Sequence, residues 1–171
     1  KLLLVRTSIN LMPNKHIVDR YLDTLKPLKF DLDNKGLDYY IPQKDNVDLN
    51  TILPEDFKKK YVSYVIGGTY QGKRMPAHKI VEVINNSEAK FVLLGGKEDV
   101  KNSDYIIKNT NKNNAISLCG KINLNESASV IKQSNVVITN DTGLMHIASA
   151  FYKKIISLWG CTSPVLGMNP Y

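Results

Sequence analysis

Five short apolar runs, separated by segments with helical periodicity, constrain the fold of this chain more than any other feature. The runs are rich in Val, Ile and Leu, have the length of strands, and cover residues 61–66, 90–95, 115–120, 135–140 and 154–160. The segments between them place apolar residues on one helical face, and Pro76 stands at a first helical position. Strands that are apolar throughout and alternate with helices are typical of parallel sheets covered on both faces. We therefore predict an α/β fold with a Rossmann-like parallel sheet and helices on both faces.

The region before the first strand has a different composition. Residues 14–28 carry a helical stripe of apolar side chains that stops near Pro27. Residues 30–60 are rich in Asn, Asp and Lys and are interrupted by Gly and Pro, so we expect a linker or partly ordered arm there. The chain starts without Met and ends at Tyr171 directly after a proline. We interpret it as a fragment with a domain over residues 58–171, truncated at its C-terminus.

The net charge limits the kinds of binding partner that we expect, and the cysteine content indicates the cellular compartment. The 23 Lys and Arg against 16 Asp and Glu give a net charge of +7, which suits phosphorylated ligands, anionic lipid surfaces or nucleic acid. Cys119 and Cys161 lack CxxC spacing and stand in apolar surroundings, which indicates a reducing compartment rather than a disulfide framework or a zinc site. No apolar run approaches the roughly 20 residues of a membrane-spanning helix. We therefore predict a cytoplasmic protein.

The turn after the first predicted strand carries the parts of a phosphate site. In an open parallel sheet, ligands bind where strands end and helices begin. The segment GGTYQGKRMP, residues 67–76, offers the close backbone approach of Gly68, the hydroxyl of Thr69 and the cations Lys73 and Arg74. The alternative interpretation is a flexible loop with surface lysines. We expect Lys73 to be an exposed loop residue whose removal weakens phosphate binding without unfolding the domain.

The same turn matches the P-loop pattern G-x-x-x-x-G-K from Gly67 to Lys73, so a P-loop-like NTPase is an alternative enzyme hypothesis. In P-loops a Ser or Thr that binds magnesium follows the lysine, but Arg74 stands there in this chain. Pro76 also begins the helix later than a P-loop helix begins, although VVITND provides an acidic strand of the kind such enzymes use. We treat the NTPase as the weaker enzyme hypothesis.

Two further strand-to-helix turns carry polar residues. Glu98 and Asp99 follow the second strand, where a carboxylate accepts ribose hydroxyls in dinucleotide sites. Acids at a helix N-terminus are also favourable without any ligand. After the fourth strand, Thr142 is a natural N-cap, and Gly143 leaves the first helical amides open to an anion. Asp141 can hold a sugar hydroxyl beside it, although capping alone would also explain the Asp-Thr-Gly triplet.

The histidines do not indicate catalysis or metal binding. His146 follows Thr142 by one helical turn, a position more typical of a packed histidine than of a catalyst. His16 and His78 are isolated, so no metal site is expected. Asp31 and Asp33 form the D-x-D pattern of some metal-dependent sugar transferases, but they lie in the charged linker and we assign them no role.

Five segments taken together resemble a known enzyme family. GGTYQGKRMP, LLGGKED, CGKINL, NDTGLMHIASAF and ISLWGCTSP, in this order and spacing, are similar to the donor-binding half of the heptosyltransferases of glycosyltransferase family nine. The resemblance covers residues 58–171. Residues 1–57, with the helix NKHIVDRYL, resemble the end of the family's N-terminal domain. The resemblance implies two facing Rossmann-like domains, the GT-B arrangement, and inverting transfer of heptose from ADP-heptose to the lipopolysaccharide inner core without a metal or other cofactor.

The resemblance also implies roles for individual residues. The expected donor contacts are phosphate at Thr69 and Lys73, diphosphate at Thr142 and Gly143, ribose at Glu98 or Asp99, adenine near Ile122, and heptose at Asp141, with Gly68 and His146 in support. The family's general base lies in its N-terminal domain, so we expect this chain to bind the donor without transferring sugar. Met75 stands where many relatives carry Trp, and Cys161 where Pro is usual, which leaves the exact nucleotide sugar open.

The expected partners follow from the same resemblance. They are ADP-heptose or a related nucleotide sugar, and a lipopolysaccharide core or similar glycolipid acceptor reached by peripheral contact with the inner membrane. A noncatalytic basic module that binds nucleotides or nucleic acid is a further alternative. The tyrosines are scattered rather than interleaved with a basic stripe, so we do not expect nucleic acid as a partner.

Overall fold

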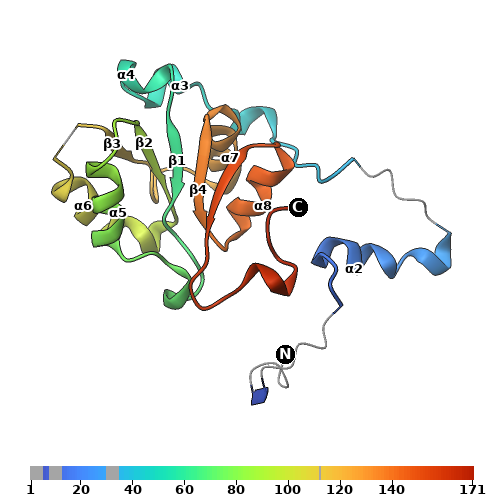
Figure 1. The fold of residues 1–171 in the computed structure, drawn as a ribbon. Helices are drawn as coiled ribbons and strands as arrows, with labels where there is room; N and C mark the ends of the chain where they lie inside the picture. The colour runs from blue at the N-terminus through green and yellow to red at the C-terminus, as the bar shows by residue number, and fades with distance from the viewer. Residues whose placement is uncertain (1–5, 8–12, 30–34, 112) are drawn as a thin grey trace.

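The five predicted strands form one parallel sheet. The computed structural model describes residues 6–7, 13–29, 35–111 and 113–171. The strands are β1 (Val62–Val65), β2 (Phe91–Leu94), β3 (Ala115–Ser117), β4 (Val136–Asn140) and β5 (Lys154–Leu158). They lie in the order β3-β2-β1-β4-β5 with all neighbours parallel (Figure 1). The prediction of a Rossmann-like parallel sheet is therefore confirmed.

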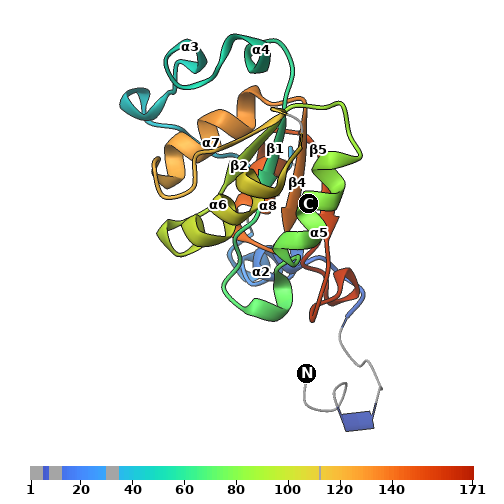
Figure 2. The ribbon, with the colours of Figure 1, turned by 90° about the vertical axis from the view of Figure 1, so that its left-hand side faces the viewer.

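Four helices connect the strands and cover both faces of the sheet (Figure 2). They are α5 (Ala77–Asn85), α6 (Val100–Asn109), α7 (Leu124–Gln133) and α8 (Gly143–Ala150). Successive strand residues point to opposite faces, so Tyr64 packs with residues of α5 and α6 while Val65 packs with residues of α7 and α8. A capping box begins α7, because Asn123 and Glu126 exchange hydrogen bonds through their side chains and backbone amides.

The order of the strands decides where a ligand can bind. The chain runs outward from β1 to β2 and β3, and then returns to the other side of β1 to form β4. The register pairs Val65 of β1 with Thr139 of β4, so the turns that follow these two strands lie next to each other. Such a reversal point, at the carboxyl ends of the strands, is where open α/β sheets bind ligands.

The linker prediction is wrong for residues 43–58. These residues contain a short 3₁₀ helix (Gln43–Asp45) and the helices α3 (Leu49–Ile52) and α4 (Glu55–Lys58). Leu53 and Phe57 are buried in the same core cluster as Val65, and Asp45 accepts hydrogen bonds from the side chains of Asn123 and Asn125. A few apolar side chains thus anchor a segment whose overall composition is polar. Asp31 and Asp33 lie outside the described residues.

Helix α2 (Ile17–Asp23) ends before Pro27, as predicted, and packs against the C-terminal segment rather than the sheet. The Ile17 amide donates to the carbonyl of Gly167, and the Arg20 guanidinium donates to the carbonyl of Leu166 over 2.8 Å. Figure 1 shows α2 beside the C-terminus and apart from the strands. Every residue of α2 is at least partly exposed, so these hydrogen bonds, rather than a buried face, hold the helix in place.

Candidate functional site

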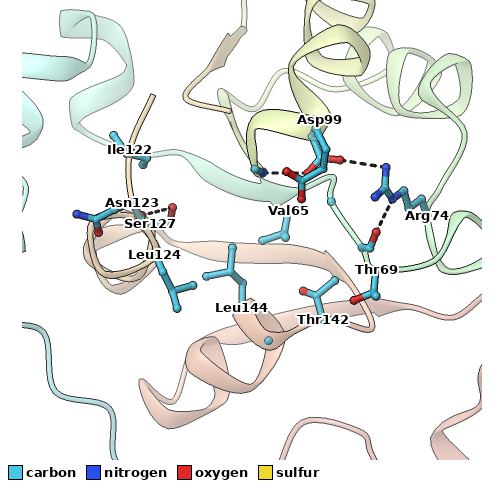
Figure 3. Close-up of a pocket in the computed structure, with 16 residues that line it drawn as sticks. Val65, Thr69, Arg74, Asp99, Ile122, Asn123, Leu124, Ser127, Thr142 and Leu144 are labelled. Carbon is cyan, nitrogen blue, oxygen red and sulfur yellow. Dashed lines mark hydrogen bonds and ion pairs between the residues drawn. The ribbon is translucent and has the colours of Figure 1, made fainter. Parts of the chain in front are cut away.

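The turns at the carboxyl ends of the strands surround one cavity of about 580 Å³ (Figure 3). Proteins bind small ligands in pockets of about this size. The turn after β1, the turn after β2, the start of α7 and the start of α8 each form part of the wall. The lining residues are Val65, Gly67, Gly68, Thr69, Arg74, Gly95, Gly96, Glu98, Asp99, Ile122, Asn123, Leu124, Ser127, Thr142, Gly143 and Leu144.

The N-terminus of α8 opens into this cavity. Thr142 is the N-cap residue, as predicted, but no described side chain makes a capping hydrogen bond to the helix. A Cβ atom added to Gly143 would meet no described atom within 4 Å. The first amides of α8 therefore face open space and carry the positive end of the helix dipole. An anion bound there would satisfy backbone groups that the described side chains leave unpaired.

Asn140 holds the neighbouring turn in place, a role that the sequence did not reveal. Its buried side chain donates to the carbonyls of Ile66 (3.1 Å) and Gly67 (2.9 Å) and accepts from the amide of Met75 (3.3 Å). Both ends of the turn, residues 67–75, are thus fastened to the end of β4. The only sequence signal was an asparagine at the end of a predicted strand.

Lys73 and Asp141 form an ion pair at the edge of the site. Lys73 Nζ lies 2.6 Å from Asp141 Oδ2, and the two side chains are 18% and 4% exposed. Neither residue lines the cavity, although Asp141 directly precedes Thr142. The expectation of an exposed loop lysine is therefore wrong, because Asp141 draws the side chain inward. Of the predicted phosphate contacts, the cavity brings together Gly68, Thr69, Thr142 and Gly143, with Lys73 beside them.

The two acidic residues after β2 differ in their environments. Asp99 is buried, its Oδ2 accepts from the amide of Gly96 over 2.9 Å, and its Oδ1 lies 3.3 Å from Arg74 Nη1. A Cβ atom on Gly67 or Gly95 would come within 2.5 or 2.7 Å of Asp99 Oδ2, so both glycines are needed to make room for this carboxylate. Glu98 is exposed at the cavity. Of the two candidates for a ribose hydroxyl, Glu98 is the accessible one.

The opposite wall of the cavity is apolar. Ile122 and Leu144 are partly buried against the core, and Leu124 is 58% exposed although it is a large hydrophobic residue. Asp45 supports this wall from behind, through its hydrogen bonds to Asn123 and Asn125. A flat apolar group, such as a nucleobase, would cover these side chains.

Comparison with protein families identifies the chain. The model of glycosyltransferase family 9 (heptosyltransferase) matches residues 1–171. The chain belongs to glycosyltransferase family 9. Among curated relatives, lipooligosaccharide heptosyltransferase 2 of Haemophilus influenzae is 35% identical over 98 residues, which cover 54% of this chain and 28% of the relative. Lipopolysaccharide heptosyltransferase 2 of Escherichia coli is 28% identical over 98 residues, with the same shares of the two chains.

Solved structures of the family share the fold. A family 9 glycosyltransferase from Veillonella parvula superposes with a TM-score of 0.79 at 25% identity, covering 95% of this chain and 49% of that one. The E. coli heptosyltransferase WaaC with ADP superposes with a TM-score of 0.69 at 22% identity, covering 95% of this chain and 50% of that one. The chain therefore spans about half the length of these structures and a smaller share of the curated relatives.

The family 9 assignment and the local geometry both disfavour the P-loop alternative. In a P-loop the helix begins at the lysine, whereas here Lys73 closes a 3₁₀ turn (Gln71–Lys73) and α5 begins only at Ala77. The hydrogen bond from the Met75 amide to Asn140 keeps the chain extended between these two elements. The match to G-x-x-x-x-G-K is thus a coincidence of sequence.

His146 lies in α8 of this family 9 domain, beside the cavity rather than in its wall. Partial burial lowers the pKa of its imidazole, and the nearby carboxylate of Asp141 opposes that shift. Elsewhere among the described residues, no three His, Cys, Asp or Glu side chains gather to hold a metal ion. Within the same ranges, no helix is long and apolar enough to cross a bilayer.

Proposed function

We propose that this chain supplies the donor-binding half of an enzyme that transfers heptose from ADP-heptose, or a related nucleotide sugar, to the lipopolysaccharide inner core or a similar glycolipid. The observation that carries the proposal is the open N-terminus of α8 at a cavity whose other walls are a hydroxyl-bearing loop, an accessible carboxylate and an apolar surface. The helix N-terminus and the hydroxyl-bearing loop suit a diphosphate, the carboxylate suits a ribose, and the apolar surface suits a base. The curated relatives are named heptosyltransferases, and the WaaC structure contains ADP.

In this proposal each part of the donor has its own contacts. The diphosphate lies at the amides of Gly143 and Leu144, near the hydroxyls of Thr69 and Thr142. The ribose hydroxyls donate to Glu98, and the base covers Ile122. The sugar extends toward Asp141, which accepts hydrogen bonds from its hydroxyls, and Lys73, paired with Asp141 beside the cavity, faces the phosphate next to the sugar.

This arrangement suits an inverting transfer without a metal. The departing nucleoside diphosphate gains negative charge, and groups fixed in advance around it lower the barrier. A helix N-terminus, two threonine hydroxyls and a lysine are such groups. We assign residues 58–171 to the donor domain and residues 1–57 to the preceding part of the enzyme, of which Leu53 and Phe57 pack into the core of the donor domain. The general base that deprotonates the acceptor belongs to the facing domain, so this chain alone binds donor and transfers no sugar.

We place the enzyme in the cytoplasm, in peripheral contact with the inner membrane. The net charge of +7 would draw it toward an anionic lipid surface that carries the glycolipid acceptor. Co-sedimentation with vesicles that contain anionic lipid, compared with neutral vesicles, measures this contact directly.

Calorimetric titration tests the donor site. The chain is titrated with ADP, UDP, GDP and adenosine, in EDTA and in Mg²⁺, and we expect ADP to bind most tightly with equal affinity in both. If no nucleoside diphosphate binds at millimolar concentration, the proposal is wrong. A strict Mg²⁺ requirement would instead favour an NTPase, and DNA binding that falls steeply with salt would favour a nucleic-acid module.

A further inference from the structure

Arg74 occupies a position in the cavity that the family resemblance did not assign. Of the described residues that line the cavity, Arg74 alone is a lysine or arginine. Lys73, its neighbour in sequence, is drawn to Asp141 and lies outside the lining. Among the described residues, the positive side chain in the cavity wall is therefore Arg74, whereas Lys73 lies beside that wall.

Arg74 and the N-terminus of α8 flank the same glycine. A Cβ atom built on Gly68 would lie 3.2 Å from Cγ of Arg74 and 3.8 Å from Cγ2 of Thr142. Figure 3 shows Thr69 between these two side chains. An anion held at the amides of α8 is thus within the part of the cavity that Arg74 borders.

The guanidinium of Arg74 is held in place with donors to spare. Its Nε donates to the carbonyl of Gly68 over 2.5 Å. Its Nη1 lies 3.3 Å from Asp99 Oδ1 in a geometry that makes no hydrogen bond, so this buried oxygen lacks a hydrogen-bond partner among the described residues. A guanidinium carries five N–H donors, and its flat shape matches two oxygens of a phosphate. Asp99 therefore orients Arg74, and the guanidinium of Arg74 keeps free N–H donors with which to bind an anion.

We propose that Arg74 binds the phosphate next to the ribose of the nucleotide, with Asp99 as the residue that positions it. The proposal rests on the proposed function, since it refines the contacts of the same donor. Arg74 is linked through Asp99 to the loop of Glu98, on the ribose side of the cavity, whereas Lys73 is paired with Asp141 on the sugar side. The two adjacent cations thus serve the two ends of the diphosphate.

The test compares adenosine, AMP and ADP on four forms of the chain: the unchanged chain, Arg74→Gln, Arg74→Lys and the control Lys108→Gln. Lys108 is exposed in the last turn of α6, at the opposite end of the helix from the cavity, and its replacement removes the same charge. We expect Arg74→Gln to lower the affinity for AMP and for ADP by roughly tenfold or more, which is the effect of losing one charged hydrogen bond. The affinity for adenosine should stay unchanged. Arg74→Lys retains the positive charge but not the planar guanidinium, so its affinities for AMP and ADP should lie between those of the unchanged chain and those of Arg74→Gln.

Other outcomes separate the possible errors. If AMP and ADP bind Arg74→Gln as tightly as the unchanged chain, the role of Arg74 is wrong while the donor site stands. If Arg74→Gln lowers the affinity for adenosine as much as the affinity for ADP, Arg74 only shapes the loops and does not contact phosphate. If the unchanged chain binds no nucleotide, the proposed function fails as well. A measurement without substitution covers the case of a variant that does not fold: the Arg74 Nε–H resonance of ¹⁵N-labelled chain shifts with AMP but not with adenosine.

Discussion

Lys73 Nζ lies 2.6 Å from Asp141 Oδ2, and this pair joins the turn after β1 to the turn after β4. Two residues that each look like ligand contacts in the sequence are thus partners of one another in the structure. The pair is largely shielded from water, so each charge depends on the other for its stabilisation. The turn therefore keeps its shape without a ligand, and a donor would meet a site that is already formed.

We expect Lys73→Ala to lower the free energy of unfolding by about 2 kcal/mol, because the buried carboxylate of Asp141 loses its counter-charge. Urea denaturation at pH 7 measures the loss. The double variant Lys73→Ala/Asp141→Asn is the control, since it also removes the uncompensated charge and should recover part of the stability. A single variant as stable as the unchanged chain would show that the ion pair does not form in solution.

Gly143→Ala should separate binding from stability. The added methyl group meets no described atom within 4 Å, and alanine favours helix more than glycine, so we expect unfolding free energy to stay equal or rise slightly. The same methyl group occupies the space in front of the first α8 amides, so ADP affinity should fall. Gly67→Ala is the contrasting variant, because its Cβ would lie 2.5 Å from Asp99 Oδ2 and should destabilise the fold. Normal ADP affinity in Gly143→Ala would argue against a diphosphate at this helix.

Asn140→Ala should destabilise the chain by about 2–4 kcal/mol, because it leaves several buried backbone groups without their partners. Those groups are the carbonyls of Ile66 and Gly67 and the amide of Met75. Asn86→Ala is a matched control, since its side chain bonds to the Glu82 carbonyl on the exposed surface of α5 and its loss should cost much less. Thermal and urea denaturation of both variants give the comparison. Equal losses would mean that the loop does not depend on Asn140.

The pH dependence of stability should contain a contribution from His146. Burial lowers its pKa below the ordinary value of 6.5, Asp141 opposes the shift, and His16 and Lys73 add to it. The folded state therefore binds the proton less readily than the unfolded chain does. The stability that neutral His146 contributes to the folded state is fully present above about pH 6.5 and is lost as the pH falls through the lowered pKa.

Urea denaturation between pH 7.5 and 5 checks this expectation about His146. His146→Gln should flatten the fall in stability toward acid, whereas His78→Gln, at an exposed position on α5, is the control variant. If both variants follow the pH profile of the unchanged chain, His146 is not responsible for the acid sensitivity.

The sheet and its helices were predictable because their signals are local. Each strand is a continuous apolar run, and a capping pair such as Asn123 and Glu126 is visible within four residues. The sequence indicated Arg74 as a phosphate-site cation, but its pairing with Asp99 and the role of Asn140 were not predictable. They depend on the pairing of β1 with β4 and on the approach of the turn after β2. Composition also misjudged residues 43–58, since the buried side chains of Leu53 and Phe57 suffice to anchor a segment that is otherwise polar and largely exposed.

The attachment of α2 has a consequence for the order in which the chain folds during synthesis. A helix of seven residues is marginal by itself in water, and Arg20 of α2 bonds to Leu166, which is 146 residues later in the chain. The ribosome must release the segment around Gly167 before Ile17 can reach its hydrogen-bond acceptor. Helix α2 is therefore fixed only after all five strands have been made, although it precedes every one of them in the chain.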